Sequence, residues 1–251
     1  DTLGAARAAA IEHFIDRLCN GKEVFDFAIY FSEVFNNKNR KGFDVNIGNP
    51  PYIQLHGDQG ALANKYQDSK FEPFARMGDI YALFYERGQQ LLRDGGHLCY
   101  ITSNKWMRAG YGEKLRAFLA TKTQPKILID FAGQKIFDSA TVDTNILLFQ
   151  RGSSALPASA CIATTDCRKN LSVFVKQHAT PCRFKPAESW VILSPTEQSI
   201  KSKIEKIGVP LKNWDIKIDR GLLTGCNEAF IIDEKKRREL IEQDPNGDEG
   251  I

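Results

Sequence analysis

The residues best suited to chemistry are Asn49, Pro50, Pro51 and Tyr52, which directly follow the apolar segment 43–48. Neither proline has a backbone N–H, and each holds φ at about −65°. Pro51 also keeps Pro50 out of the helical region. The sequence therefore predicts a stiff loop that offers two acceptors, the Asn49 side-chain oxygen and the Pro50 carbonyl, with an aromatic ring beside them.

Two adjacent acceptors suit an amine that carries two hydrogens. An exocyclic amine on a nucleobase is a poor nucleophile because its lone pair is delocalised into the ring. One acceptor for each N–H would draw the nitrogen towards tetrahedral geometry and favour in-line attack on an electrophilic methyl group, while Tyr52 stacks on the base. Orientation and electrostatics would achieve this without a covalent protein nucleophile.

The elements that must position this loop predict an α/β domain. Their order of strand, helix, strand, helix, strand predicts a twisted, mainly parallel sheet with helices on its faces. The last two strands are close enough for a hairpin, which would place one antiparallel strand at the edge of the sheet. Ligands bind at the carboxyl ends of such strands, where residues 49–52 fall. We expect helices over 2–20, 79–94 (with Asp79 as N-cap) and 112–123, and strands over 43–48, 97–103, 126–132 and 144–152.

Two segments are less regular, and the character of the chain changes near residue 152. Segment 24–35 reads as a strand or a short packed segment, and 54–79 as a long loop of the kind that is more often functional than idle. We expect a partial catalytic domain over 1–152. A linker and the beginning of a mixed α+β domain follow over 153–251.

The composition is that of a globular protein with a proper core. Of its 251 residues, 42% are hydrophobic and 26% charged, and a net charge of +3 permits a nucleic-acid partner without arguing for one. No apolar run is long enough to span a membrane and no signal peptide opens the chain, so we expect a cytoplasmic protein. Six cysteines form no CxxC pair and have no histidines at zinc-ligand spacing, so we expect reduced thiols and no metal.

Asn-Pro-Pro-Tyr after a strand resembles the catalytic motif of amino-methylating, S-adenosylmethionine-dependent methyltransferases, especially adenine-specific DNA methyltransferases. Segment 79–107 is similar to the helix and strand that follow the catalytic loop in that family, and 131–149 to its hairpin region. Segment 221–233 resembles the entry to the target-recognition region of type IIG restriction–modification enzymes and their stand-alone relatives. The resemblance runs from about Phe25 to Asp233, with all four motifs in the family's order.

The resemblance implies roles for individual residues. Asn49 and the Pro50 carbonyl would accept from the target amine, and Tyr52 and Phe137 would stack on the two faces of the flipped base. Phe137 would otherwise be an ordinary core residue.

The resemblance also implies a cofactor site and contacts with double-stranded DNA. Ile80 and Phe84, one helical turn apart, would line the pocket for the adenine of S-adenosylmethionine, although plain core packing explains them equally well. Weaker candidates for DNA contact lie at a strand end and in the segment resembling a recognition loop, where solvated charge or a tight turn are the ordinary alternatives: Lys105, Arg108, Thr224 and Asn227.

One part of the family's pattern is missing from this sequence. No glycine-rich cofactor loop with a G-x-G pattern precedes Asn49, and we find no D…ExK nuclease signature. The first residue is not Met, and the chain ends without a closing element. We therefore expect a piece of a longer enzyme, inactive alone, whose partners include the upstream methyltransferase half and a fused or separate nuclease.

Three alternatives stay open. The same motif serves enzymes that methylate a glutamine amide in proteins or guanine in RNA, but about a hundred residues follow the last expected strand of the sheet, which favours DNA. A non-catalytic DNA-binding subunit would not need paired acceptors. Cytosine amino-methylation uses the same chemistry, but Ser or Asp more often stands there in place of Asn49.

Overall fold

The computed structural model describes Gly4 and residues 25–37, 40–134, 136–137, 142–164, 167, 170–186, 188–216 and 233–243. The helix expected over 2–20 and the segment 221–232 lie outside these residues, apart from Gly4. The helices are α2 (Phe27–Tyr30), α3 (Ser32–Phe35), α4 (Gly57–Tyr66), α5 (Tyr81–Leu91), α6 (Glu113–Lys122), α7 (Leu171–His178), α8 (Pro195–Ile207) and α9 (Glu234–Gln243). The strands are β1 (Phe43–Gly48), β2 (Leu92–Ser103), β3 (Thr123–Asp130), β4 (Thr144–Arg151), β5 (Ala158–Ile162) and β6 (Thr180–Cys182).

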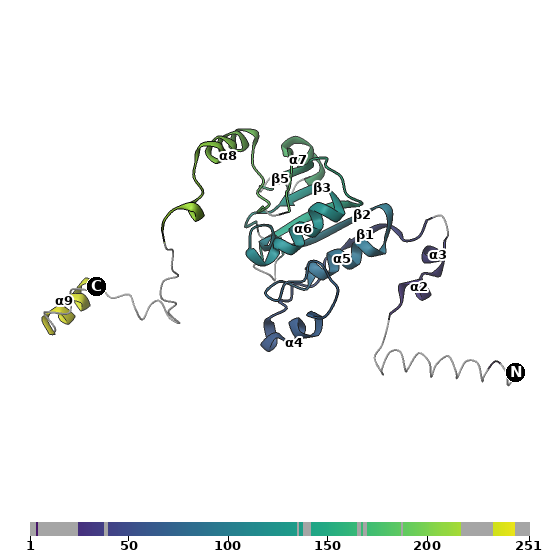
Figure 1. Ribbon diagram of the computed structural model, residues 1–251, viewed down its shortest axis with the longest axis horizontal. Helices are drawn as coiled ribbons and strands as arrows, with labels where there is room; N and C mark the ends of the chain where they lie inside the picture. Colours follow the sequence, from purple (N-terminus) through teal and green to yellow (C-terminus); the bar gives the residue numbers. More distant parts are fainter. Residues whose placement is uncertain are drawn as a thin grey trace. The chain divides into compact units, whose positions relative to one another are not determined.

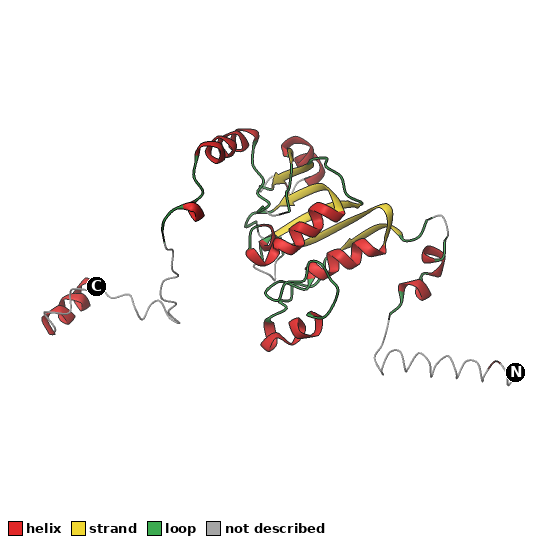
Figure 2. Ribbon diagram, in the orientation of Figure 1, coloured by secondary structure: helices red, strands yellow, loops and turns green. Residues whose placement is uncertain are grey.

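The α/β class is confirmed, with one six-stranded sheet in the order β1-β2-β4-β3-β5-β6 (Figure 2). Two neighbouring pairs, β1 with β2 and β3 with β5, are parallel, whereas β2 with β4, β3 with β4 and β5 with β6 are antiparallel. The expectation of a mainly parallel sheet with an antiparallel strand at its edge is therefore wrong. The β3–β4 hairpin forms, but it turns back towards β2, so β4 pairs on both sides and lies inside the sheet.

Helices α5 and α6 cover one face of the sheet (Figure 1). The alternation of side chains along each strand separates two cores. Leu98, Leu147 and Phe149, all with no exposed surface, face these helices, whereas Ile129 and Cys161 pack on the other face with Phe174 of α7. Because both faces are covered in the middle of the sheet, the strand ends are left for function.

The aromatic segment before β1 forms α2 and α3, so the strand alternative for 24–35 is wrong. Phe27, Phe31 and Phe35 recur every four residues, with Phe31 at the junction between α2 and α3. Their ring centroids lie 6.4, 5.3 and 5.3 Å from that of Phe43. The segment therefore packs as an aromatic cluster against the beginning of β1.

The long loop expected over 54–79 contains α4, so this expectation is wrong for the helical part of α4 that follows Gly60. Inside α4, Asp58, Gln59 and Gly60 have positive φ values of 50°, 53° and 81°. The helix after it begins at Tyr81 with Ile80 as N-cap, one residue beyond the expected Asp79. The strand that follows begins at Leu92 rather than 97, because pairing with β1 already starts there, before a register shift.

The sheet continues beyond residue 152. Strand β5 pairs with β3, and β6 pairs with β5. The chain divides into two compact units after Ile200, and α8 crosses that division. Residue 152 is therefore not a break in the sheet, and the functional division expected there stays a prediction.

Candidate functional site

The loop 49–52 begins directly after β1, at the carboxyl end of that strand. Pro50 is buried, whereas Asn49 and Pro51 are exposed and Tyr52 is half-buried. The Tyr52 hydroxyl donates a hydrogen bond of 3.2 Å to the carbonyl of Ile101 on β2. Burial raises the pKa of Tyr52 to about 12, so the phenol stays neutral and keeps its donor at neutral pH.

The segment after Tyr52 is tied to the beginning of α5. The Leu55 amide donates to the Gly78 carbonyl and the Ile80 amide to the Ile53 carbonyl, both at 2.9 Å. Gln54 and Asp79 form an antiparallel bridge between these two bonds. The loop and the start of α5 are therefore held together by backbone hydrogen bonds, and Ile80 lies beside the loop.

The structure brings together the two aromatic residues expected to face a base. The ring centroids of Tyr52 and Phe137 lie 6.5 Å apart with an interplanar angle of 64°. Phe137 is half-buried in the connection between β3 and β4. Rings that sandwich a flat base are parallel, so one ring must rotate to admit a base between them. Tyr81 packs edge-on against Tyr52 at 6.2 Å and fixes the other side of that ring.

A pocket of about 520 Å³ opens beside Tyr52, a volume within the usual range for small-ligand sites. It collects residues from the loop, α4, the start of α5 and the end of β2. Among its lining residues are Tyr52, Asp58, Asp79, Ser103, Lys105 and Val142. The candidate Lys105 therefore lies in the same pocket as the aromatic ring of the loop.

Arg108, the neighbouring DNA-contact candidate, has a different environment. Its guanidinium lies 3.6 Å from the carboxylate of Asp130, which is only 1% exposed. That carboxylate also accepts hydrogen bonds from the Asn104 side chain at 2.7 Å and the Ala132 amide at 3.0 Å. Asp130 thus connects the carboxyl ends of β2 and β3, and Arg108 forms an ion pair with the carboxylate that makes this connection.

Asp130 and Ser103 were missed as functional candidates from the sequence. Asp130 is the last residue of β3 and Ser103 the last residue of β2, the two strands on either side of β4. A polar residue at the end of each apolar strand was the available signal, because ligands bind at this edge of α/β sheets.

The two cofactor candidates differ in exposure. Ile80 is half-buried, while Phe84 is 40% exposed on a helix whose other aromatic residues, Tyr81 and Tyr85, are fully buried. An exposed phenyl ring one turn after Ile80 leaves apolar surface that a flat ligand could cover. The adenine-pocket role suggested for the two residues stays a prediction.

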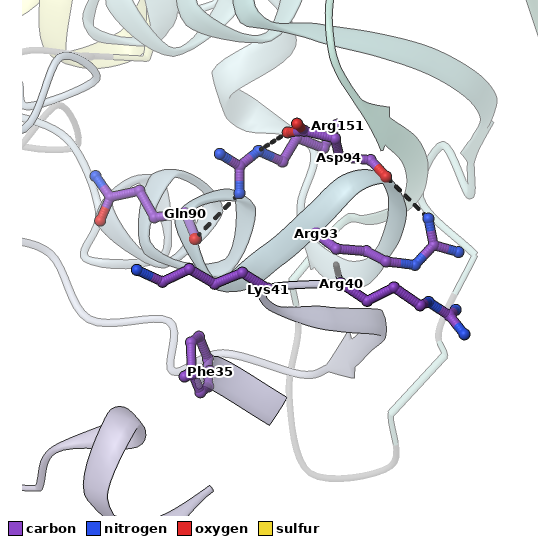
Figure 3. A pocket seen from close by; sticks show the side chains of 7 residues that line it. All are labelled: Phe35, Arg40, Lys41, Gln90, Arg93, Asp94 and Arg151. Atoms are coloured by element: carbon purple, nitrogen blue, oxygen red, sulfur yellow. Dashed lines mark hydrogen bonds and ion pairs between the residues drawn. The ribbon is translucent and has the colours of Figure 1, made fainter. Parts of the chain in front are cut away.

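A second pocket, of about 570 Å³, lies at the opposite end of β1 and β2 (Figure 3). The arginines that line it are already paired with acids. Arg40 and Arg93 both pair with Asp44, and Arg151 pairs with Asp94 at 3.3 Å. The hydrogen bond from Arg93 lowers the pKa of Asp44. These pairs fasten the beginnings of the two strands, and Lys41 also lines the pocket.

Other expectations stand as follows. Thr224 and Asn227 lie outside the described residues. Within the described ranges, no group of three or more metal-ligating side chains could hold a metal ion. No helix in that part of the chain combines the length and apolar character needed to cross a membrane. Four free cysteines are present there, and Cys99 is half-buried rather than fully buried.

Comparison with known proteins identifies the family. The sequence profile of the family described as Eco57I restriction-modification methylase matches residues 5–137, more than half of the chain and including both Tyr52 and Phe137. The type IIG restriction endonuclease BpuSI has a similar structure, 16% identical with a TM-score of 0.42, covering 64% of this chain and 20% of that one.

Curated relatives point the same way. The type II methyltransferase M.PaeR7I of Pseudomonas aeruginosa is 27% identical over 76% of this chain and 35% of its own length. M.XhoI of Xanthomonas vasicola is 30% identical over 77% of this chain and 38% of its own length. RM.Eco57I of Escherichia coli, a type II restriction enzyme and methyltransferase, is 34% identical over 43% of this chain and 11% of its own length. This chain thus spans little more than a third of these relatives at most, and it belongs to the Eco57I restriction-modification methylase family.

Proposed function

We propose that this chain is the catalytic-loop part of a DNA methyltransferase that transfers a methyl group from S-adenosylmethionine to the exocyclic amine of adenine. The observation that carries the proposal is the loop 49–52 at the carboxyl end of β1, with Tyr52 lining a pocket. Membership of a restriction-modification methylase family makes DNA the expected substrate.

Asn49 and Pro50 would hold the target amine. Asn49 is exposed, so its side-chain oxygen can reach a ligand, and Pro50 is buried, so its carbonyl has a fixed direction. Each acceptor takes one N–H, which localises the lone pair on the nitrogen and leaves it facing the methyl donor. The Tyr52 ring, anchored through its hydroxyl to β2, keeps the base flat while Phe137 closes the other face.

Ile80 and Phe84 would hold the adenine of the cofactor, which supplies the electrophilic methyl group. The backbone bonds between 53–55 and 78–80 keep this part of α5 beside the loop. A ligand on the exposed Phe84 ring would therefore bind close to the groups that hold the amine. These contacts orient the base and the cofactor and exclude water. No proton needs to move before the methyl transfer.

The partners follow from the proposed chemistry. Double-stranded DNA would present the flipped base, and the longer protein would supply the remaining cofactor-binding residues and a recognition region, with a nuclease in the same chain or a separate one. RM.Eco57I combines restriction and methyltransferase activities in its name, and M.PaeR7I is named as a methyltransferase alone. We propose that this segment by itself is inactive.

The test uses the full-length protein that contains this chain, expressed in a host without adenine methylation. Single-molecule sequencing of the host DNA should show methylated adenines at one short motif. Asn49→Ala should abolish this methylation. The control is Asn36→Ala, which changes an exposed asparagine before β1 and should leave the methylation intact. Unmethylated DNA from a well-expressed protein would exclude DNA as the substrate and favour a protein or RNA amine. A mark on cytosine would retain the chemistry and correct the base.

A further inference from the structure

Among the described residues that line the pocket beside Tyr52, Lys105 is the one cationic side chain. The other charged lining residues, Asp58 and Asp79, are carboxylates. Lys105 is exposed, and no described residue forms an ion pair with its ammonium group. A lysine that faces a pocket and has no ion-pair partner among the described residues can donate to a ligand there.

The backbone of Lys105 is held firmly although its side chain is exposed. The preceding residue, Asn104, donates its amide to the Asp143 carbonyl at 2.9 Å and its side-chain NH₂ to Asp130 at 2.7 Å. The Lys105 carbonyl accepts from the Ala109 amide at 2.9 Å. The two residues after it, Trp106 and Met107, are 0% and 1% exposed and anchor the short helix η1 (Lys105–Met107) in the core.

This anchoring distinguishes Lys105 from a lysine that only neutralises a phosphate. A phosphate contact works as a point charge and tolerates a mobile stem. Arg108, three residues later, is already engaged by Asp130. The two cations expected to act alike therefore differ. Arg108 is bound within the protein, whereas Lys105 starts from a fixed backbone position and lines the pocket beside Tyr52.

The chemistry of the amine selects which atom of the base can accept. In adenine the lone pair of the exocyclic nitrogen delocalises onto N1 and N3, so a cation at either nitrogen would favour the delocalised form and oppose attack on a methyl group. N7 receives none of that lone pair by resonance. It also lies next to the amine, so a donor at N7 can bind the base while Asn49 and Pro50 hold the amine.

We propose that Lys105 is a specificity-determining residue that donates a hydrogen bond to the purine N7 of the extruded base. Cytosine has no equivalent acceptor, so the contact would select adenine over cytosine. The inference rests on the proposed function of the loop 49–52. A site built to donate to a substrate atom discriminates strongly against an analogue without it, because the donor is then left unpaired.

The test compares methylation of synthetic duplexes by the full-length protein, with adenine or 7-deazaadenine at the target position. Loss of a hydrogen bond to a charged donor predicts a drop of roughly 10- to 100-fold in kcat/KM on 7-deazaadenine for the unaltered protein. Lys105→Met should lose about the same on adenine and show no further loss on 7-deazaadenine. Lys114→Met removes an exposed lysine outside the pocket and should keep the full preference for adenine.

Lys105→Arg and the salt dependence separate a base contact from a phosphate contact. Arg keeps the positive charge, so Lys105→Arg would keep its activity if residue 105 contacted a phosphate. In that case the unaltered protein would also methylate the adenine and 7-deazaadenine duplexes with the same kcat/KM. A phosphate contact would also lower the slope of log affinity against log salt by about one in Lys105→Met. Either result, or an undiminished preference for adenine in Lys105→Met, would overturn the proposal. Unmethylated adenine duplex with the unaltered protein would instead show that the proposed function is wrong.

Discussion

Removing the carboxylate of Asp130 should destabilise the sheet more than its single ion pair suggests. The side chain is 1% exposed and accepts two short hydrogen bonds, from Asn104 and from the Ala132 amide. Hydrogen bonds to a charged group contribute about 1.5 to 3 kcal/mol each. Since the two donors are only partly buried and can turn to water in the variant, we expect Asp130→Ala to lower the free energy of unfolding by about 2 to 4 kcal/mol.

The matched control is Arg108→Gln, which removes only the ion pair. Arg108 is 59% exposed and 3.6 Å from the carboxylate, so its loss should cost less than about 1 kcal/mol. Asp130→Asn should fall between the two, because its side-chain oxygen can still accept from the Ala132 amide.

Urea unfolding followed by tryptophan fluorescence measures these differences. Trp106 and Trp190 are both fully buried, with ring centroids 5.2 Å apart, and Trp106 lies two residues after Asn104. Their emission therefore reports on the region that Asp130 supports. A loss below about 0.5 kcal/mol in Asp130→Ala, or an equal loss in Arg108→Gln, would refute the view that the carboxylate acts mainly through its buried hydrogen bonds.

Three further outcomes can be checked on the same protein. Gly88→Ala should cost about 1 to 3 kcal/mol in urea unfolding in spite of the better helix propensity of alanine, because the new Cβ would lie 2.5 Å from the Leu98 side chain; a neutral result would show that the helix can move away from the sheet. Burial raises the pKa of the Cys161 thiol to about 11, so an alkylating reagent at pH 8 should modify it far more slowly in folded than in urea-unfolded protein, as peptide mass spectrometry would show. Because the folded-state pKa of Tyr52 is raised to about 12, its contribution to stability should be complete below pH 10 and be lost between about pH 10 and 12; Tyr52→Phe should lack that part of the alkaline loss, and identical pH profiles would contradict the assignment.

Sequence patterns predicted the elements that carry the site because their signals are local. The β-branched residues before Gly48 and the apolar spacing of 113–122 were enough to locate β1 and α6. The position of β4 inside the sheet was not predictable in this way. Periodicity identifies a strand, but its partners are chosen by packing across the whole sheet.

The remaining misses have a related cause. Residues 54–79 have no sustained apolar period, and Asp58 and Gln59 break the helix with positive φ values that no local pattern marks, so α4 was read as loop. Asp130 was passed over because a carboxylate is normally exposed, and its burial depends on donors from Asn104 and Ala132. Lys105 and Arg108 have different environments because of the same carboxylate, which only the folded structure brings within reach of Arg108.

The antiparallel insertion of β4 has a consequence for the order in which the chain can fold. Strands β2 and β3 do not pair with each other, since β4 lies between them and bonds to both. As the chain leaves the ribosome, β1 and β2 can pair early, but β3 has no neighbour in the sheet until residues 144–151 emerge. Strand β4 thus joins β2 to β3 in one step, and until then the facing edges of β2 and β3 leave backbone N–H and C=O groups unpaired and open to other chains.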